Sequence, residues 1–200
     1  VLLVAGAQLR HIIMITSMAV ASVVVGVFTG LVKGYQIQRL IGFVNQSSSD
    51  KQLQDLIQQV KQAKRAFGNG GLLGKGWLQG PLTNNRSIPV QWADFPSTAL
   101  AEQFGMVGVG VLLSLYALVL VRVWRTAHLS KDMLGTYICA GVFSMLLWHV
   151  FENIGMVTGL LPITGITLPL MSYGGSSMVS VMLGIGLLVN VSMRRQMFRG

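Results

Sequence analysis

The sequence predicts an all-α integral membrane protein with four transmembrane helices and one large extracytoplasmic loop. The chain of 200 residues is 52% hydrophobic and 10% charged, so it carries about half the charge of an ordinary soluble domain. Four apolar stretches are long enough to cross the hydrocarbon core of a bilayer. A polar segment, residues 33–103, separates the first two stretches, and we expect the chemistry to lie there.

The distribution of charged residues indicates which kind of partner the protein binds. The net charge is +9 at pH 7, but the cations lie in the polar segment and at helix ends rather than in one patch beside base-stacking aromatics. This placement excludes a nucleic-acid partner and favours anionic membrane lipids. Cys139 is the single cysteine and lies in an apolar run, where we expect it to be a packing residue. The chain starts without Met or a signal peptide, so we expect it to be part of a longer membrane protein.

The expected spans are residues 12–32, 104–121, 133–158 and 178–193. Basic residues flank one end of these spans: Arg10, Arg122, Arg125, His128, Lys131, Arg194, Arg195 and Arg199. Because short cytoplasmic loops are rich in Lys and Arg, that end is expected to be cytoplasmic, with residues 194–200 as a cytoplasmic tail. Residues 33–103 and 159–177 then lie on the outer side as a loop and a structured turn.

A surface helix is expected within the outer loop. After the capping residues Ser47–Asp50, apolar residues recur at helical spacing: Leu53, Leu56, Ile57, Val60 and Phe67. The opposite face carries the cations Lys51, Lys61, Lys64 and Arg65. An amphipathic helix of this kind lies on a membrane surface, and its cations either contact lipid phosphates or are solvated.

A glycine-rich stretch, GNGGLLGKG, follows the surface helix at residues 68–76. Its spacing is one residue too long for a nucleotide-binding phosphate loop, and Gly76 stands where that loop needs Ser or Thr. Its backbone N–H groups, with Lys75, would suit an anion at the membrane surface. A flexible turn is the alternative.

Two acids, Asp94 and Glu102, stand where a water-soluble headgroup would meet lipid. Asp94 precedes Pro96, and Pro is favoured in the first turn of a helix, so one interpretation is that Asp94 caps that helix. The other interpretation is that Asp94 is a reactive carboxylate.

Polar residues within the third span form a second cluster. His149, Glu152 and Asn153 share one helix face, at a depth where ionisable groups are costly. They form either a functional site or a structural hydrogen-bond cluster, which we favour. The following segment, residues 159–177, is broken by prolines and glycines, and such backbone is tolerated only where it is buried or lines a cavity.

Several motifs resemble the SEDS (shape, elongation, division and sporulation) family, which includes RodA, FtsW and SpoVE. The matching segments are GYQ at 34–36 with Arg39, AFGNGGLLGKGWLQG at 66–80, DF at 94–95 with LAEQFG at 100–105, and NIGMVTGLLPITGITLPLMSYGGSS at 153–177. GKGWLQG and NIGM are more similar to the RodA branch. The resemblance implies a bundle of about ten helices in the bacterial cytoplasmic (inner) membrane, of which this chain is the C-terminal part. It also implies polymerisation of lipid II into peptidoglycan strands, for cell shape and division, beside a class B penicillin-binding transpeptidase.

The resemblance places the essential loop aspartate of the family on Asp94. Trp92 and Ala93 replace the His and Thr of the usual pattern, and Pro96-Ser97 replace an Ile-Phe pair. Gln103 replaces a second Glu. We predict an inverting glycosyltransferase in which Asp94, as general base, takes the proton of the acceptor hydroxyl. A diphosphate leaves without protonation, so the second carboxylate of glycosidases is unnecessary.

The remaining predictions concern binding. The candidate substrate-binding residues are Lys75, Gly74, Gly76, Arg65, Arg86, Glu102, Ser172 and Tyr173. No protein metal site and no definite cofactor are predicted, and the need for a divalent cation is left open. Two other functions stay open. A flippase or carrier of the lipid-linked precursor would line a path with His149, Glu152 and Asn153, and a non-catalytic scaffold for the transpeptidase would use Trp77 at its interface.

Overall fold

The computed structural model describes residues 8–29, 51–84 and 91–196, and within them every regular element is a helix. The elements are α1 (Leu9–Phe28), α3 (Lys51–Asn69), α4 (Pro81–Asn84), α5 (Gln91–Asp94), α6 (Pro96–His128), α7 (Met133–Thr158) and α8 (Gly175–Gln196). Four of them, α1, α6, α7 and α8, are long and apolar enough to span a membrane. The predicted all-α membrane fold is confirmed, and the protein is a multi-pass membrane protein.

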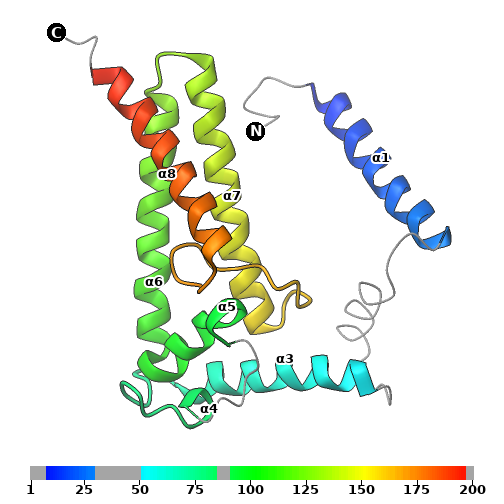
Figure 1. Ribbon diagram of the computed structural model, residues 1–200, viewed down its shortest axis with the longest axis vertical. Helices are drawn as coiled ribbons and strands as arrows, with labels where there is room; N and C mark the ends of the chain where they lie inside the picture. Colours follow the sequence, from blue (N-terminus) through cyan, green and yellow to red (C-terminus); the bar gives the residue numbers. More distant parts are fainter. Residues whose placement is uncertain (1–7, 30–50, 85–90, 197–200) are drawn as a thin grey trace.

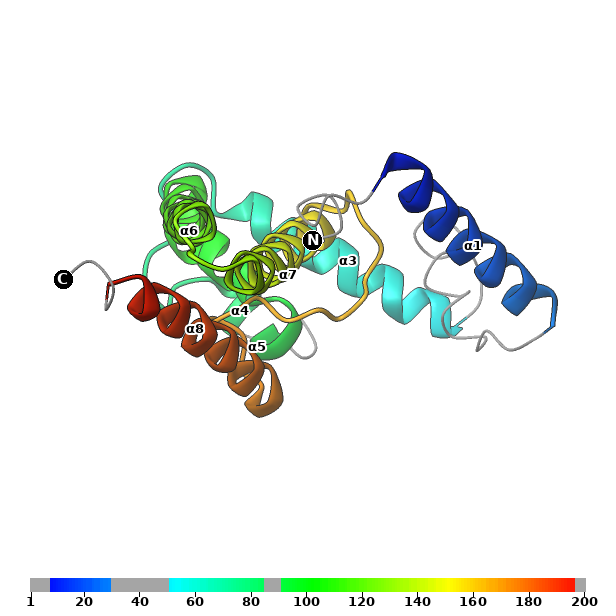
Figure 2. The same ribbon diagram turned by 90° about the horizontal axis from the view of Figure 1, so that it is seen from above.

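Three of the spans form a bundle in which α6 and α7 run side by side and α8 crosses them (Figures 1 and 2). Two small cores hold it together: Val123, Cys139 and Val191 in one, and Val142, Leu146 and Val181 in the other. Cys139 is fully buried, so the prediction that it is a packing residue is confirmed. By contrast, α1 stands apart in Figure 1, and none of its most apolar window is buried against the other described residues.

Helix α3 lies across the ends of α6 and α7 that point downward in Figure 1. Ala63 and Ala66 have no exposed surface and pack against a cluster that includes Phe95 and Met156. The cations of the opposite face, Lys61, Lys64 and Arg65, are exposed. The predicted amphipathic surface helix is therefore confirmed for these positions, whereas Ser47–Asp50 and the side chains of Lys51, Leu53 and Leu56 lie outside the described residues.

The helix bounds differ from the expected ones at several ends. The expected span 133–158 agrees with α7, and the expected start of 104–121 falls at the kink of α6, but its end is too early because α6 continues to His128. The non-helical backbone of Gly105, with φ 66° and ψ −163°, divides α6 at a kink into two helical segments, residues 96–104 and 106–128. Helix α8 runs from Gly175 to Gln196 and takes in the last residues of the expected turn 159–177, and α1 begins earlier than residue 12 and ends at Phe28.

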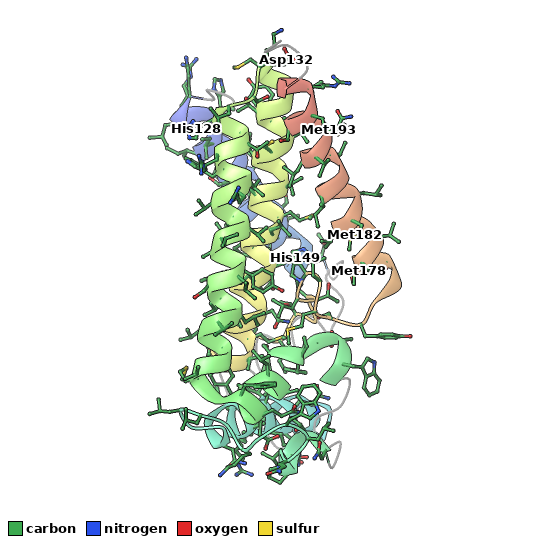
Figure 3. The ribbon with its side chains drawn as sticks, turned by 90° about the vertical axis from the view of Figure 1, so that its left-hand side faces the viewer. His128, Asp132, His149, Met178, Met182 and Met193 are labelled. Carbon is green, nitrogen blue, oxygen red and sulfur yellow. The ribbon has the colours of Figure 1, made fainter. Side chains whose placement is uncertain are left out.

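The two ends of the bundle carry different elements. Helices α3, α4 and α5 gather at one end, and the segment 159–174, here called the outer turn, leads from that end up to the start of α8 inside the bundle (Figure 1). The 129–132 connection and the C-terminal end of α8 lie at the other end, where Figure 3 labels His128, Asp132 and Met193. The four-span topology predicts that the described part of the polar segment, which carries α3, α4 and α5, lies at the opposite end from the 129–132 connection, as it does here.

Candidate functional site

Asp94 is the last residue of α5, at the end of the bundle that carries the outer turn. The next side chain, Phe95, is only 1% exposed and is packed among Ala66, Met156 and Ile163. Phe95 also occupies the N-cap position of α6, and its carbonyl oxygen accepts hydrogen bonds from the N–H group and the hydroxyl of Thr98. Asp94 therefore does not stand at the capping position, and the buried Phe95 fixes its place in the chain.

The carboxylate of Asp94 faces the outer turn. A Cβ atom added to Gly165 would lie 3.6 Å from Asp94 Oδ2 and 3.9 Å from Oδ1. The main chain of α5 is joined to the same turn, since the N–H of Tyr173 donates to the carbonyl of Trp92 at 2.9 Å. The turn is fixed in its own right, because Leu168 N–H donates to Ser172 Oγ at 2.7 Å and the Tyr116 hydroxyl of α6 donates to the carbonyl of Pro169. Asp94 thus sits beside a tightly held segment.

The amide of Asn153 on α7 supplies a further connection. Its Nδ2 group donates to the carbonyl oxygens of Asp94 and Ile166, each at 2.9 Å, and its Oδ1 accepts from Ser97 Oγ at 2.9 Å. The prediction that His149, Glu152 and Asn153 bond to one another is therefore wrong. Neither Glu152 Oε2 nor His149 Nδ1 has a hydrogen-bond partner in the described part of the chain. The amide of Asn153 does not bond to these two side chains, because its hydrogen bonds go to α5, the outer turn and the start of α6.

An aromatic groove of about 680 Å³ opens next to α5. Its walls come from the segment after α3, from α4, α5 and α6, and from the outer turn: Trp77, Thr83, Trp92, Pro96, Ala99, Leu100, Gln103, Phe104, Met171 and Tyr173. Trp77, Trp92 and Tyr173 are 67%, 59% and 80% exposed. Asp94 is not a lining residue of this groove, although Trp92 and Pro96, which stand on either side of it in the chain, are.

The glycine loop, residues 68–80, uses its N–H groups within the protein. Gly74 N–H donates to the carbonyl of Gly70 at 2.8 Å, Lys75 N–H to that of Glu102 at 2.9 Å, and Gly76 N–H to that of Gln103 at 3.0 Å. The expectation that the backbone of Gly74 and Gly76 binds a substrate anion is therefore wrong, because these donors are already occupied. The alternative prediction, a flexible turn, is wrong too, because the backbone of the loop is bonded to α6.

Its role becomes clear at the kink in α6. In a regular α-helix the N–H groups of Met106 and Val107 would donate to the carbonyls of residues 102 and 103. At the kink they donate instead to the carbonyls of Gly71 and Leu72, at 2.9 and 3.1 Å. The carbonyls of 102 and 103 accept from the loop in turn, so four bonds to the loop replace the two that the helix loses. Unpaired backbone groups are costly when buried, so the loop stabilises the kink.

Glu102 joins the glycine loop to α4. Its side chain has no exposed surface, and its carboxylate accepts from Thr83 N–H at 2.8 Å, Leu82 N–H at 3.2 Å and Asn69 Nδ2 at 3.2 Å. Glu102 precedes the kink at Gly105, in the outer segment of α6 that adjoins α4. Burial alone raises the pKa of its carboxyl, but the hydrogen bonds from Thr83, Leu82 and Asn69 outweigh it and hold that pKa below its usual value of 4.5. The predicted substrate contact of Glu102 is not supported, because the carboxylate is enclosed.

Comparison with known proteins decides the family. A family model for cell cycle proteins of the FtsW/RodA/SpoVE type matches residues 1–197. The chain belongs to the FtsW/RodA/SpoVE family. It is similar to peptidoglycan glycosyltransferase MrdB of Escherichia coli K12, with 41% identity over 138 residues, which is 69% of this chain and 37% of the relative. It is also similar to peptidoglycan glycosyltransferase RodA of Treponema pallidum, with 37% identity over 82% of this chain and 37% of that protein.

Two more comparisons cover nearly the whole chain. Stage V sporulation protein E of Bacillus subtilis is 35% identical over 94% of this chain and 50% of that protein. A solved structure, described as "Structural coordination of polymerization and crosslinking by a peptidoglycan synthase complex", superposes with a TM-score of 0.74 at 28% identity, over 100% of this chain and 53% of the other. The chain thus spans between about a third and a half of these FtsW/RodA/SpoVE proteins.

In this member of the FtsW/RodA/SpoVE family, the other candidate residues fall into three groups. Lys75 and Arg65 have exposed side chains, and Tyr173 lines the aromatic groove. Ser172 is 5% exposed and accepts a hydrogen bond inside the outer turn, so the expectation of a substrate contact is not supported for it. Arg86 lies outside the described residues. Among the residues that are described, no three His, Cys, Asp or Glu side chains are grouped as in a metal site.

Sequence reasoning missed the roles of Ser97 and Trp92, which it noted only as departures from the family pattern. Ser97 is fully buried and orients the Asn153 amide, whereas Trp92 forms a wall of the groove. A weak signal existed for Trp92, because an exposed Trp where a helix meets the membrane surface often marks the interface. No local pattern pointed to Ser97, since its partner lies 56 residues away in the chain.

Proposed function

We propose that the whole protein is an inverting peptidoglycan glycosyltransferase of the bacterial cytoplasmic membrane that polymerises lipid II, with residues 33–103 on the outer side. One observation carries the proposal: the Asp94 carboxylate faces Gly165 of the outer turn, and Asp94 stands in the chain between the groove-lining residues Trp92 and Pro96, in a chain whose relatives bear that name. The basic residues at the other end support this orientation, because cytoplasmic loops are rich in Lys and Arg.

In the proposed reaction Asp94 is the general base. Its carboxylate takes the proton from a sugar hydroxyl of one lipid-linked molecule as that oxygen forms a bond to the anomeric carbon of the other. The bond from this carbon to the lipid diphosphate breaks, and the diphosphate leaves with the bonding electrons. Cations stabilise the charge that develops there, and the exposed Lys75 and Arg65 are the described candidates.

The proposal extends to a partner. A class B penicillin-binding transpeptidase would crosslink the strands that this protein polymerises, and the structural relative described as a peptidoglycan synthase complex supports such an assembly. The aromatic groove would accept part of the lipid-linked substrate, because ligand sites are concave and largely apolar with few polar groups.

The decisive experiment is Asp94→Asn in the full-length protein with its transpeptidase, measured as polymerisation of purified lipid II. Asn keeps the size of Asp but cannot accept a proton, so the rate should fall at least about a hundredfold while the melting temperature stays near that of the parent.

Asp132→Asn is the matched control, because Asp132 is an exposed acid at the opposite end that makes no side-chain capping bond. It should leave the rate unchanged. A near-parental rate for Asp94→Asn would overturn the proposal and favour a carrier or a scaffold.

A further inference from the structure

The side chain of Asn153 forms hydrogen bonds with several segments of the protein outside its own helix. It is fully buried on α7, and its amide bonds to the end of α5, the start of α6 and the outer turn. The next hydroxyl along α7, Thr158, bonds only to carbonyls of its own helix, Ile154 at 2.9 Å and Gly155 at 3.1 Å. One side chain therefore joins α7 to the outer turn and to the junction of α5 and α6, which lies 56 to 59 residues earlier in the chain.

The orientation of the amide follows from its partners. Two carbonyl oxygens, those of Asp94 and Ile166, need donors and so face the Nδ2 group. The Ser97 hydroxyl donates to Oδ1 from the other side and holds the amide against a flip. The Asn153 side chain is fully buried and the two carbonyls are partly buried, so loss of the amide would remove a partner that water replaces only in part.

The two clamped carbonyls belong to the candidate base itself and to the residue that follows the glycine it faces. Asp94 carries the carboxylate itself, and Ile166 directly follows Gly165, the residue that the carboxylate faces. By holding both main-chain positions, the amide sets the distance and direction between the carboxylate and the outer turn. A general base must lie within hydrogen-bond reach of the proton it takes, and a displacement of about 1 Å can cost about a hundredfold in rate.

We propose that Asn153 is a positioning residue that clamps the main chain at Asp94 and Ile166 and thereby aims the Asp94 carboxylate. The inference rests on the proposed role of Asp94 as the base. Asn153 itself makes no contact with the reacting atoms and acts through Asp94.

The test compares Asn153→Ala with Thr158→Ala in the full-length protein with its transpeptidase, using purified lipid II. Asn153→Ala should lower kcat by about ten- to a hundredfold per folded molecule, because the Asp94 carboxylate is no longer held in the correct position. KM should change little, because the groups that bind the substrate are not altered. Hydrogen exchange should rise in the peptides covering 91–97 and 163–168 but not in α8. Thr158→Ala should match the parent in every respect, and Ser97→Ala should fall between the two, because it frees the amide to turn.

Two outcomes would overturn the inference. One is an Asn153→Ala protein with parental kcat per folded molecule, and the other is unchanged exchange at 91–97. If Asn153→Ala fails to fold, Asn153→Ser, which keeps one donor, and Ser97→Ala take over the kinetic comparison under the same criteria. Asp94→Asn in the same assay separates the two proposals. If Asp94→Asn is active, the proposed function fails, and if it is inactive while the Asn153 variants keep parental kcat, only the positioning role fails.

Discussion

The glycine loop and the outer turn look alike in sequence, since both are irregular, glycine-containing segments that follow a helix. Their hydrogen bonds differ. The loop bonds main chain to main chain, where Lys75 and Gly76 donate to α6 and Gly71 and Leu72 accept from it. The turn is joined to the helices through side chains as well, those of Asn153 and Tyr116, besides the main-chain bond from Tyr173 N–H to the Trp92 carbonyl. This contrast indicates that the loop is a structural support for α6, whereas the turn is the region whose details act on Asp94.

The role of the glycine loop as a support for α6 is tested most severely by Gly74→Ala. A Cβ atom there would lie 2.1 Å from the carbonyl oxygen of Gln103, and the residue has φ +83°, which only glycine adopts readily. Backbone strain and overpacking together should lower the free energy of unfolding by about 3 kcal/mol or more. Thermal unfolding of the full-length protein in detergent would measure the loss.

Gly68→Ala is the matched control for Gly74→Ala. Gly68 lies near the end of α3, and a Cβ atom there meets no atom within 4 Å. Ala is a better helix former than Gly, so this variant should be unchanged or more stable by up to about 1 kcal/mol. Equal stability of the Gly74→Ala and Gly68→Ala proteins would contradict the support role of the loop.

Glu102→Gln should have the next largest effect, because it weakens the bonds that the buried carboxylate accepts from α4 and Asn69. A loss of about 1 to 3 kcal/mol is expected at pH 7. The folded-state pKa of Glu102 lies below its usual 4.5, so its contribution is fully present above that value and is lost as the pH falls through the lowered pKa. The melting temperatures of parent and variant should therefore converge on acidification. A difference that does not depend on pH would show that the charge of Glu102 is not what stabilises the loop.

The sequence predicted the helical class, the four spans and the surface helix because each depends on local apolar content or periodicity. Helix α7 even agrees with its expected bounds. The end of α6 was misjudged, since apolar content stops at Val121 while the helix continues through Arg122 to His128. Basic residues beyond an apolar core are compatible with a helix that emerges into water, so charge marks the membrane boundary rather than the helix boundary.

The site was predicted less well, because its contacts join residues that are distant in the chain. The motif around Asp94 selected the acid on which the proposed function rests, but it gave no sign that Gly165, 71 residues later in the chain, lies beside its carboxylate. The N–H groups of Gly74 and Gly76 looked free for an anion, and only the kink at Gly105 shows why they are not. Glycine content alone does not tell whether a loop binds a ligand or another part of the chain.

Gly165→Ala should have the smallest effect on stability and yet act on the reaction. Gly165 has φ +76°, so Ala is strained there by about 1 to 2 kcal/mol, but its Cβ atom would be in ordinary contact with Asp94 Oδ2 at 3.6 Å. Gly71→Ala is the matched control, because Gly71 has φ +58° and a Cβ atom there meets nothing within 4 Å. Both variants should therefore lose similar stability, and only Gly165→Ala should slow polymerisation of lipid II, because its methyl group restricts the space beside the carboxylate. If the two variants polymerise at the same rate per folded molecule, the outer turn has no special relation to Asp94 and the contrast with the glycine loop is one of packing alone.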